Sequence, residues 1–212
     1  MKLSWLGHSS FLMESSNGTK IVTDPFPPNI GYPSNKISTD LVTISHHHFD
    51  HNYKNKLNKN CNIIDTAGVF NYKDIKILGI KSYHDKLKGM KRGENIIFKF
   101  NIDGYNICHL GDLGHILDDN YLDILKNINI LLIPVGGNFT LNGKEAAFLC
   151  KKINSNIIIP MHFKTDNVTM KLDGIEKFLY HTKNNIKVSK NFINIDKNIS
   201  GKKNLVYILK LK

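Results

Sequence analysis

The fold is decided by one stretch of the sequence, Leu41-Val42-Thr43-Ile44-Ser45-His46-His47-His48-Phe49-Asp50-His51. Its first five residues form an apolar, β-branched run that is typical of a buried strand. Four residues of the metal-ligand type follow directly, namely His46, His48, Asp50 and His51. Imidazole and carboxylate groups are the usual protein ligands of zinc and other divalent ions, and four of them cannot pack together in an apolar core without polar partners. The segment therefore favours a metal site, with a solvated polar loop or a histidine-rich tract as the alternatives.

Three more residues of this type, His84, Asp112 and His162, each follow a predicted strand elsewhere in the chain. Any one of them alone would more often be a structural histidine or a turn aspartate. Together with the first segment, however, they make four strands that each deliver a ligand-type residue at the carboxyl end. Active sites of layered α/β folds collect at this end of the strands. We therefore expect these side chains to converge on one metal site.

The remaining sequence alternates short apolar runs with turn residues. The Asp103-Gly104 pair predicts a hairpin turn, and Asp24-Pro25 ends a strand because proline cannot donate a hydrogen bond to a sheet. The order of elements predicts two sheets with helices packed outside, in a single domain of residues 1–212. The predicted strands are 3–6, 11–14, 20–23, 41–45, 63–64, 75–80 with its continuation to 83, 95–102, 105–110, 128–135, 157–161 and 205–211, and the predicted helices are 119–126, 144–153 and 173–180.

Composition narrows the class of protein. No apolar run reaches the roughly 18 residues that a membrane helix needs, and the first residues are too soon polar for a signal peptide. We expect a soluble, cytoplasmic protein without a membrane partner.

Cys61, Cys108 and Cys150 form no C-x-x-C pair, so neither a thiolate zinc knuckle nor a redox pair is supported. The spacing favours three reduced, buried thiols.

The formal net charge is +11, but the lysines are scattered along the chain. The densest basic stretch is 81–92, and it has two interpretations: a solvated surface, or a patch that attracts an anionic substrate. Binding of nucleic acid stays open as the less favoured alternative.

The motif His46-x-His48-x-Asp50-His51 resembles the signature of the metallo-β-lactamase fold superfamily of metal-dependent hydrolases. The resemblance runs from Trp5 to His162. It is strongest to a small branch that includes the ascorbate-phosphate lactonase-like proteins. It implies an α/β fold, a four-layer αββα sandwich of two mixed β-sheets flanked by helices. The segments that carry it are Gly7-His8-Ser9, Thr23-Asp24-Pro25, Leu110-Gly111-Asp112, 134–140 and Pro160-Met161-His162.

The resemblance also implies a ligand set for two divalent ions, with zinc expected and manganese, iron or nickel as alternatives. One ion would be held by His46, His48 and His84, the other by Asp50, His51 and His162, and Asp112 would bridge them. Two ions about 3.5 Å apart suit hydrolysis by a bridging hydroxide. Asp50 and His8 are the predicted catalytic residues. Asp50 would accept the proton of the water, and His8 would orient Asp112, contact substrate, or merely pack behind the ligands.

Departures from other branches narrow the function. The main zinc β-lactamases usually carry Cys in place of Asp112, and the oxygen-reducing flavoproteins carry Glu in place of His48. The leading hypothesis is a hydrolase of a small, anionic ester, lactone or phosphodiester. A nuclease or phosphodiesterase acting on nucleic acid and a metal-binding sensor without catalysis are the alternatives. The loops 24–38 and 86–93 could each cover the cleft or form an interface in a homo-oligomer.

Overall fold

The computed structural model describes residues 1–33, 36–55, 57–196, 199 and 201–211, so part of the predicted 24–38 loop lies outside the described residues. The strands are β1 Lys2–Gly7, β2 Ser10–Glu14, β3 Lys20–Thr23, β4 Leu41–Thr43, β5 Asn62–Ile64, β6 Gly68–Tyr72, β7 Ile75–Tyr83, β8 Glu94–Ile102, β9 Tyr105–His109, β10 Ile130–Pro134, β11 Ile157–Met161, β12 Asn185–Val188, β13 Phe192–Asn194 and β14 Leu205–Leu209. The helices are the 3₁₀ turn η1 Pro28–Ile30, α1 Asp119–Ile124, α2 Gly143–Ile153 and α3 Glu176–Leu179.

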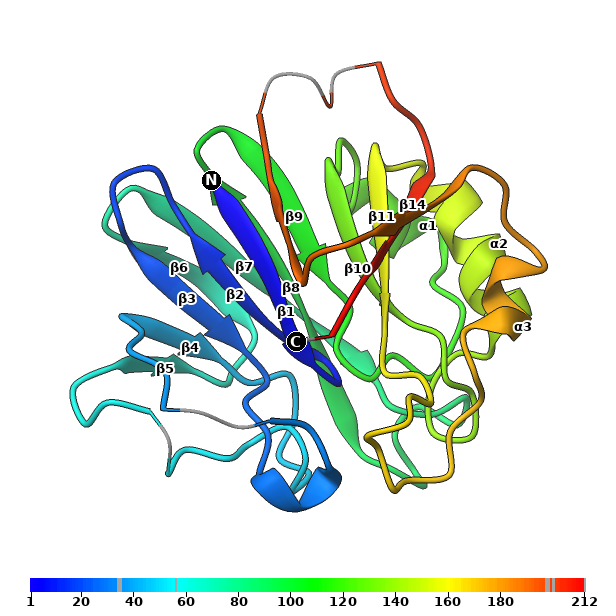
Figure 1. Cartoon of the computed structure of the whole chain (residues 1–212), viewed down its shortest axis with the longest axis horizontal. Helices are drawn as coiled ribbons and strands as arrows, with labels where there is room; N and C mark the ends of the chain where they lie inside the picture. The colour runs from blue at the N-terminus through cyan, green and yellow to red at the C-terminus, as the bar shows by residue number, and fades with distance from the viewer. Residues whose placement is uncertain (34–35, 56, 197–198, 200, 212) are drawn as a thin grey trace.

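The strands form two mixed sheets (Figure 1). A six-stranded sheet has the order β13-β1-β2-β3-β4-β5, and an eight-stranded sheet has the order β12-β14-β11-β10-β9-β8-β7-β6. Hairpins supply most of the antiparallel pairs, and β13 pairs antiparallel with β1 from far along the chain. The strands β9, β10 and β11 run parallel because α1 and α2 connect them as crossovers. The predicted α/β sandwich of two mixed sheets is confirmed.

Alternation along the strands separates two apolar layers. Ile21 and Leu41 point into the main core, which also contains Phe98 and Phe100 of β8 in the other sheet. Their neighbours Val22 and Val42 point to the opposite face, because successive side chains of a strand alternate. The main core therefore lies between the two sheets.

The outer layers differ between the two sheets. In the part of the chain that the structure describes, α1, α2 and α3 all connect strands of the eight-stranded sheet. The second apolar cluster on the six-stranded sheet is covered by loop side chains, Ile37, Leu57 and Cys61. No helix of the described residues has the length and apolar character to cross a bilayer.

The longest helix begins and ends where local chemistry requires it. Asn142 and Glu145 form a capping box at the start of α2, and Asn154 adopts the left-handed conformation that ends it. Helix α2 buries Ala146 and Leu149 on one face. The helix is followed by β11, and His162 comes directly after that strand.

The sequence did not predict β6, β12 or β13. Each is the edge strand of its sheet, and the residues of β12 are mostly exposed, so no buried apolar pattern marks them. The predicted helix 173–180 is shorter in the structure, where only Glu176–Leu179 is helical.

Candidate metal centre

The predicted site residues come together at the carboxyl ends of four strands. The segment from His46 to His51 follows β4 of the six-stranded sheet. From the eight-stranded sheet, His84 follows β7, Asp112 follows β9 and His162 follows β11. Because β9 and β11 run parallel on either side of β10, their carboxyl ends lie at the same edge. The topology thus brings together residues that are more than 100 positions apart in the sequence.

The carboxylate of Asp112 lies at the centre of this cluster. Its Oδ2 is 3.2 Å from Nε2 of His51, 3.2 Å from Nε2 of His84 and 3.1 Å from Nε2 of His162. Nε2 of His46 lies slightly farther away, at 3.9 Å. A single oxygen atom is therefore shared by histidines from both sheets.

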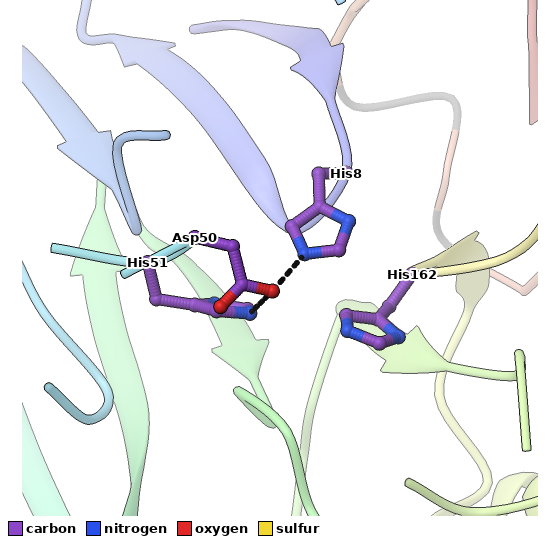
Figure 2. Close-up of side chains that lie close together, drawn as sticks. All are labelled: His8, Asp50, His51 and His162. Atoms are coloured by element: carbon purple, nitrogen blue, oxygen red, sulfur yellow. Dashed lines mark hydrogen bonds and ion pairs between the residues drawn. The ribbon is translucent and has the colours of Figure 1, made fainter. Parts of the chain in front are cut away.

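Near Asp112 the side chains form three overlapping groups, and the ligand atoms within each group lie within 4.8 Å of one another. The first group is His46, His48 and His84. The second is His8, Asp50, His51 and His162, and Figure 2 shows these four side chains pointing toward one another. These two groups contain the residues predicted for the two ions, with His8 added to the second. The third group, Asp24, His46 and His51, shares one histidine with each of them.

The unsatisfied atoms of the site fit a divalent metal. Nε2 of His46, His51 and His162 is buried and has no hydrogen-bond partner. A buried polar atom without a partner costs about 1–3 kcal/mol. Coordination of a cation by these nitrogen lone pairs would remove that cost, and histidine with carboxylate is a donor set that zinc-type ions accept. The residues present therefore fit a divalent metal ion.

The charges of the cluster also favour a cation. Burial alone would raise the pKa of Asp112, but the neighbouring His162 and His51 hold it well below its usual value. The pKa values of Asp24 and Asp50 are lowered as well. Three carboxylates thus remain ionised in a buried pocket, and they attract positive charge.

Asp24 supports the cluster from behind, and the sequence analysis did not identify it as a site residue. Its Oδ2 accepts hydrogen bonds from Nδ1 of His51 at 3.0 Å and from Oγ of Ser45 at 2.6 Å. Its Oδ1 accepts the backbone N–H of Ser45 at 2.7 Å. A proton held on Nδ1 leaves Nε2 of His51 free as a ligand atom. The available signal was the Thr23-Asp24-Pro25 segment, which carries part of the family resemblance and ends a strand, but Asp24 itself was given no role in the site.

His8 contacts Asp50 and not Asp112. Nε2 of His8 lies 3.0 Å from Oδ2 of Asp50, whereas Asp112 is approached instead by Oγ of Ser9 at 3.5 Å. Burial, with a contribution from His162, lowers the pKa of His8 to about 4, so its ring is neutral at pH 7. A neutral ring at this distance donates its Nε2 proton to the carboxylate. Burial would raise the pKa of Asp50, but the neighbouring His51 and His8 lower it.

Three residues of the centre have left-handed backbone conformations. The φ angles are 51° at His8, 39° at Asp24 and 52° at His162. Side chains other than glycine rarely adopt this region, and it costs roughly 1–2 kcal/mol per residue. The surrounding fold holds these three side chains in a conformation that also occurs outside the centre, for example at Lys73 and Asn154.

The other histidines near the motif stay outside the cluster. His47, which the prediction left out, is exposed and lies 3.9 Å from Asp65. His109 is buried at the end of β9, with Nε2 at 2.7 Å from the carbonyl oxygen of Ser9. Neither His47 nor His109 was among the predicted ligands, and both lie outside the cluster.

Two cavities differ in chemistry. One, of about 240 Å³, opens onto the cluster and is lined by His48, Phe49, Asp50, His84, Arg92, Asp112, Phe139, His162 and Met170. The other, of about 320 Å³, is lined mainly by apolar side chains such as Trp5, Leu12 and Phe26. Its described lining contains no histidine or carboxylate. Chemistry that needs a metal therefore belongs to the first, which we call the histidine cleft.

Comparisons with known proteins agree with this geometry. The family model described as "Beta-lactamase superfamily domain" matches residues 2–162. A solved structure from Thermotoga maritima, assigned as a Zn-dependent hydrolase of the metallo-β-lactamase superfamily, is 33% identical with a TM-score of 0.81, and the match covers 99% of each chain. A Methanosarcina mazei protein named a UPF0173 metal-dependent hydrolase is 28% identical over 205 residues, covering 79% of this chain and 85% of the relative. A Carboxydothermus hydrogenoformans protein of the same name is 27% identical over 198 residues, covering 78% and 85%.

The superfamily that the motif resembled is thereby confirmed, while the ascorbate-phosphate lactonase-like branch stays a prediction. The matched residues begin before His8 and end at His162, so they contain the whole predicted ligand set. This chain belongs to the beta-lactamase superfamily domain family, within the metallo-β-lactamase superfamily of metal-dependent hydrolases.

Proposed function

We propose that this protein hydrolyses a small, anionic ester, lactone or phosphodiester with two divalent cations bound in the histidine cleft. The observation that carries the proposal is the position of Asp112, whose Oδ2 lies 3.1–3.2 Å from Nε2 of His51, His84 and His162. One carboxylate oxygen between two groups of histidines has the arrangement of a bridging ligand. Membership of a hydrolase superfamily supports the same interpretation.

In this proposal each group of side chains holds one ion. His46, His48 and His84 hold the first. Asp50, His51 and His162 hold the second, and Asp112 contributes to both. Zinc is the expected metal because imidazole and carboxylate suit it, and manganese, iron and nickel accept the same donors.

The bound cations would supply Lewis acidity, which lowers the pKa of a coordinated water and polarises the bond under attack. The protein supplies orientation and a route for the proton. Asp50 accepts the proton that the attacking water loses, since its carboxylate lines the histidine cleft. His8 donates Nε2–H to Oδ2 of Asp50 and so holds the carboxylate in place. His8 is thus a positioning residue in this scheme.

A reconstitution experiment tests the proposal. Metal-depleted protein is reloaded with zinc or manganese and assayed on a panel of lactones, thioesters and phosphodiesters, with single-stranded DNA as one further substrate. We expect metal-dependent turnover of at least one small substrate and a loss of at least about 100-fold in His162→Ala.

The matched control is His47→Ala, which removes a histidine of the same motif that lies outside the cluster. It should retain wild-type activity. Metal binding without turnover of any substrate would favour the sensor alternative, and turnover of DNA alone would favour the nuclease. His162→Ala with full activity would contradict the proposed site.

A further inference from the structure

The loop after His84 is organised by a single carboxylate. Oδ1 of Asp85 accepts the backbone N–H groups of Leu87 at 2.7 Å and Gly89 at 3.0 Å. Its Oδ2 accepts those of Lys91 at 2.9 Å and Arg92 at 2.8 Å. The loop is therefore held from within, and its position is tied to the neighbouring His84.

Gly89 and Gly93 close the same loop. The N–H of Gly93 donates to the carbonyl oxygen of Gly89 at 2.9 Å, and the N–H of His84 donates to the carbonyl oxygen of Gly93 at 3.1 Å. A Cβ atom at Gly89 would lie 2.9 Å from that carbonyl oxygen of Gly93. The backbone that carries Arg92 thus has one tightly closed conformation.

This backbone delivers the side chain of Arg92 to the histidine cleft. Arg92 is half-buried and lines the cleft together with His84, Asp112 and His162. Its guanidinium group lies 4.5 Å from the ring centre of Phe139. Among the described residues, no carboxylate forms an ion pair with it and no side-chain hydrogen bond reaches it.

Other cations of the basic stretch are used differently. Lys81 pairs with Glu94 at 2.5 Å, and Lys86 pairs with Glu145. Lys91 is exposed and does not line the cleft. In the described lining of the cleft, Arg92 is the one cationic side chain. The alternative interpretation, a solvated surface, fits these lysines but does not explain an unpaired guanidinium beside the ligand cluster.

We propose that Arg92 binds the anionic group of the substrate, a phosphate or a carboxylate, and selects substrates that carry one next to an apolar part. This inference rests on the proposed hydrolase function of the same cleft. The planar guanidinium presents donors in a fork that matches such oxyanions. The ring of Phe139 packs against the guanidinium group of Arg92. Phe139 and Met170 provide an apolar wall for the remainder of the substrate.

Binding of two small probes tests the inference without turnover. Phenylphosphonate and benzoate are titrated calorimetrically into zinc-loaded wild type, Arg92→Met and Lys91→Met. Methionine keeps an apolar chain against Phe139 and removes the charge. We expect the affinity for at least one probe to fall about 10- to 100-fold in Arg92→Met, which corresponds to loss of a charge-assisted hydrogen bond. The more affected probe identifies phosphate or carboxylate as the group recognised.

Lys91→Met is the matched control, because Lys91 also donates its backbone N–H to Asp85 but does not line the cleft. It should bind both probes as wild type does. Arg92→Lys should recover part of the affinity, since lysine restores the charge without the fork. Equal affinity of wild type and Arg92→Met, or no binding of either probe to the wild type, would overturn the inference.

Metal content and turnover of a neutral and an anionic ester, 4-nitrophenyl butyrate and mono-4-nitrophenyl succinate, are measured on the same preparations. Zinc content should be equal in wild type and Arg92→Met, and the preference in kcat/KM for the succinate should fall about 10- to 100-fold. A wild type that binds no zinc contradicts the proposed function. A wild type that binds zinc while Arg92→Met keeps the preference contradicts only the role of Arg92.

Discussion

Replacement of Asp24 by asparagine should weaken metal binding although Asp24 is not proposed as a ligand. The Asp24 carboxylate is fully buried and holds three contacts, with His51 Nδ1 at 3.0 Å and with the hydroxyl and backbone N–H of Ser45 at 2.6 Å and 2.7 Å. Asparagine keeps the shape but offers only one acceptor oxygen. If that oxygen accepts the N–H of Ser45, an amide N–H group faces Nδ1 of His51. The ring then favours the tautomer with its proton on Nε2, the atom needed for the metal.

The expected size of the effect follows from these contacts. Removal of a partner that orients a histidine ligand costs about 10- to 100-fold in metal affinity, which corresponds to roughly 1.4–2.7 kcal/mol. Loss of a single hydrogen bond to a charged group, at about 1.5–3 kcal/mol, gives a similar figure. The estimate from ligand orientation and the estimate from the lost hydrogen bond agree, so the zinc dissociation constant should rise by one to two orders of magnitude.

Competition with a chromophoric chelator at pH 7 measures this constant, and circular dichroism confirms that the variant is folded. Asp65→Asn is the control, because Asp65 lies 3.9 Å from His47 in an exposed pair outside the cluster. It should bind zinc as the wild type does. A dissociation constant for Asp24→Asn within twofold of the wild type would refute the reasoning that Asp24 sets the tautomer of His51.

Three further predictions concern stability and reactivity. Removal of metal by a chelator should lower the unfolding temperature measured by differential scanning calorimetry. The expected decrease is roughly 8–16 °C for each site, if the free metal concentration was 1,000 times the dissociation constant of that site. An unchanged unfolding temperature would contradict a bound metal. Burial raises the pKa of Cys108 to about 12 and also raises the pKa of Cys150. Only the half-buried Cys61 should therefore react with a disulfide reagent at pH 8 in the native protein. Rapid labelling of all three cysteines would be inconsistent with the fold. Phe98→Ala should lose about 3–5 kcal/mol of unfolding free energy in guanidinium titrations, whereas Phe148→Ala at an exposed position should lose less than about 1 kcal/mol; equal losses would contradict the assigned core.

Much of the site could be predicted because each ligand-type residue follows an apolar strand. The run before His162 is fully buried, the run before Asp112 is buried toward its end, and the run before His84 is buried at alternate residues. The strands β9 and β11 end at a common edge. Strand ends are local features of a sequence, and their meeting follows from the parallel topology. The convergence of these residues could therefore be predicted from the sequence alone.

Other features depend on contacts that no local pattern records. Asp24 looked like the end of a strand before proline, and only the fold places its carboxylate against His51. Arg92 belonged to a diffuse basic stretch, and its direction depends on four backbone groups gathered by Asp85. The edge strand β12 was missed because its side chains are mostly exposed. Sequence patterns report burial well and report long-range polar contacts poorly.

Anomalous diffraction from crystals grown with zinc tests the central claim most directly. Two strong peaks per chain should lie on either side of Oδ2 of Asp112, at about 2.0–2.2 Å from the ligating nitrogen and oxygen atoms. One peak should contact His46, His48 and His84, and the other Asp50, His51 and His162. A map without a peak in the histidine cleft, or with zinc bound only at other places on the protein, would contradict the account.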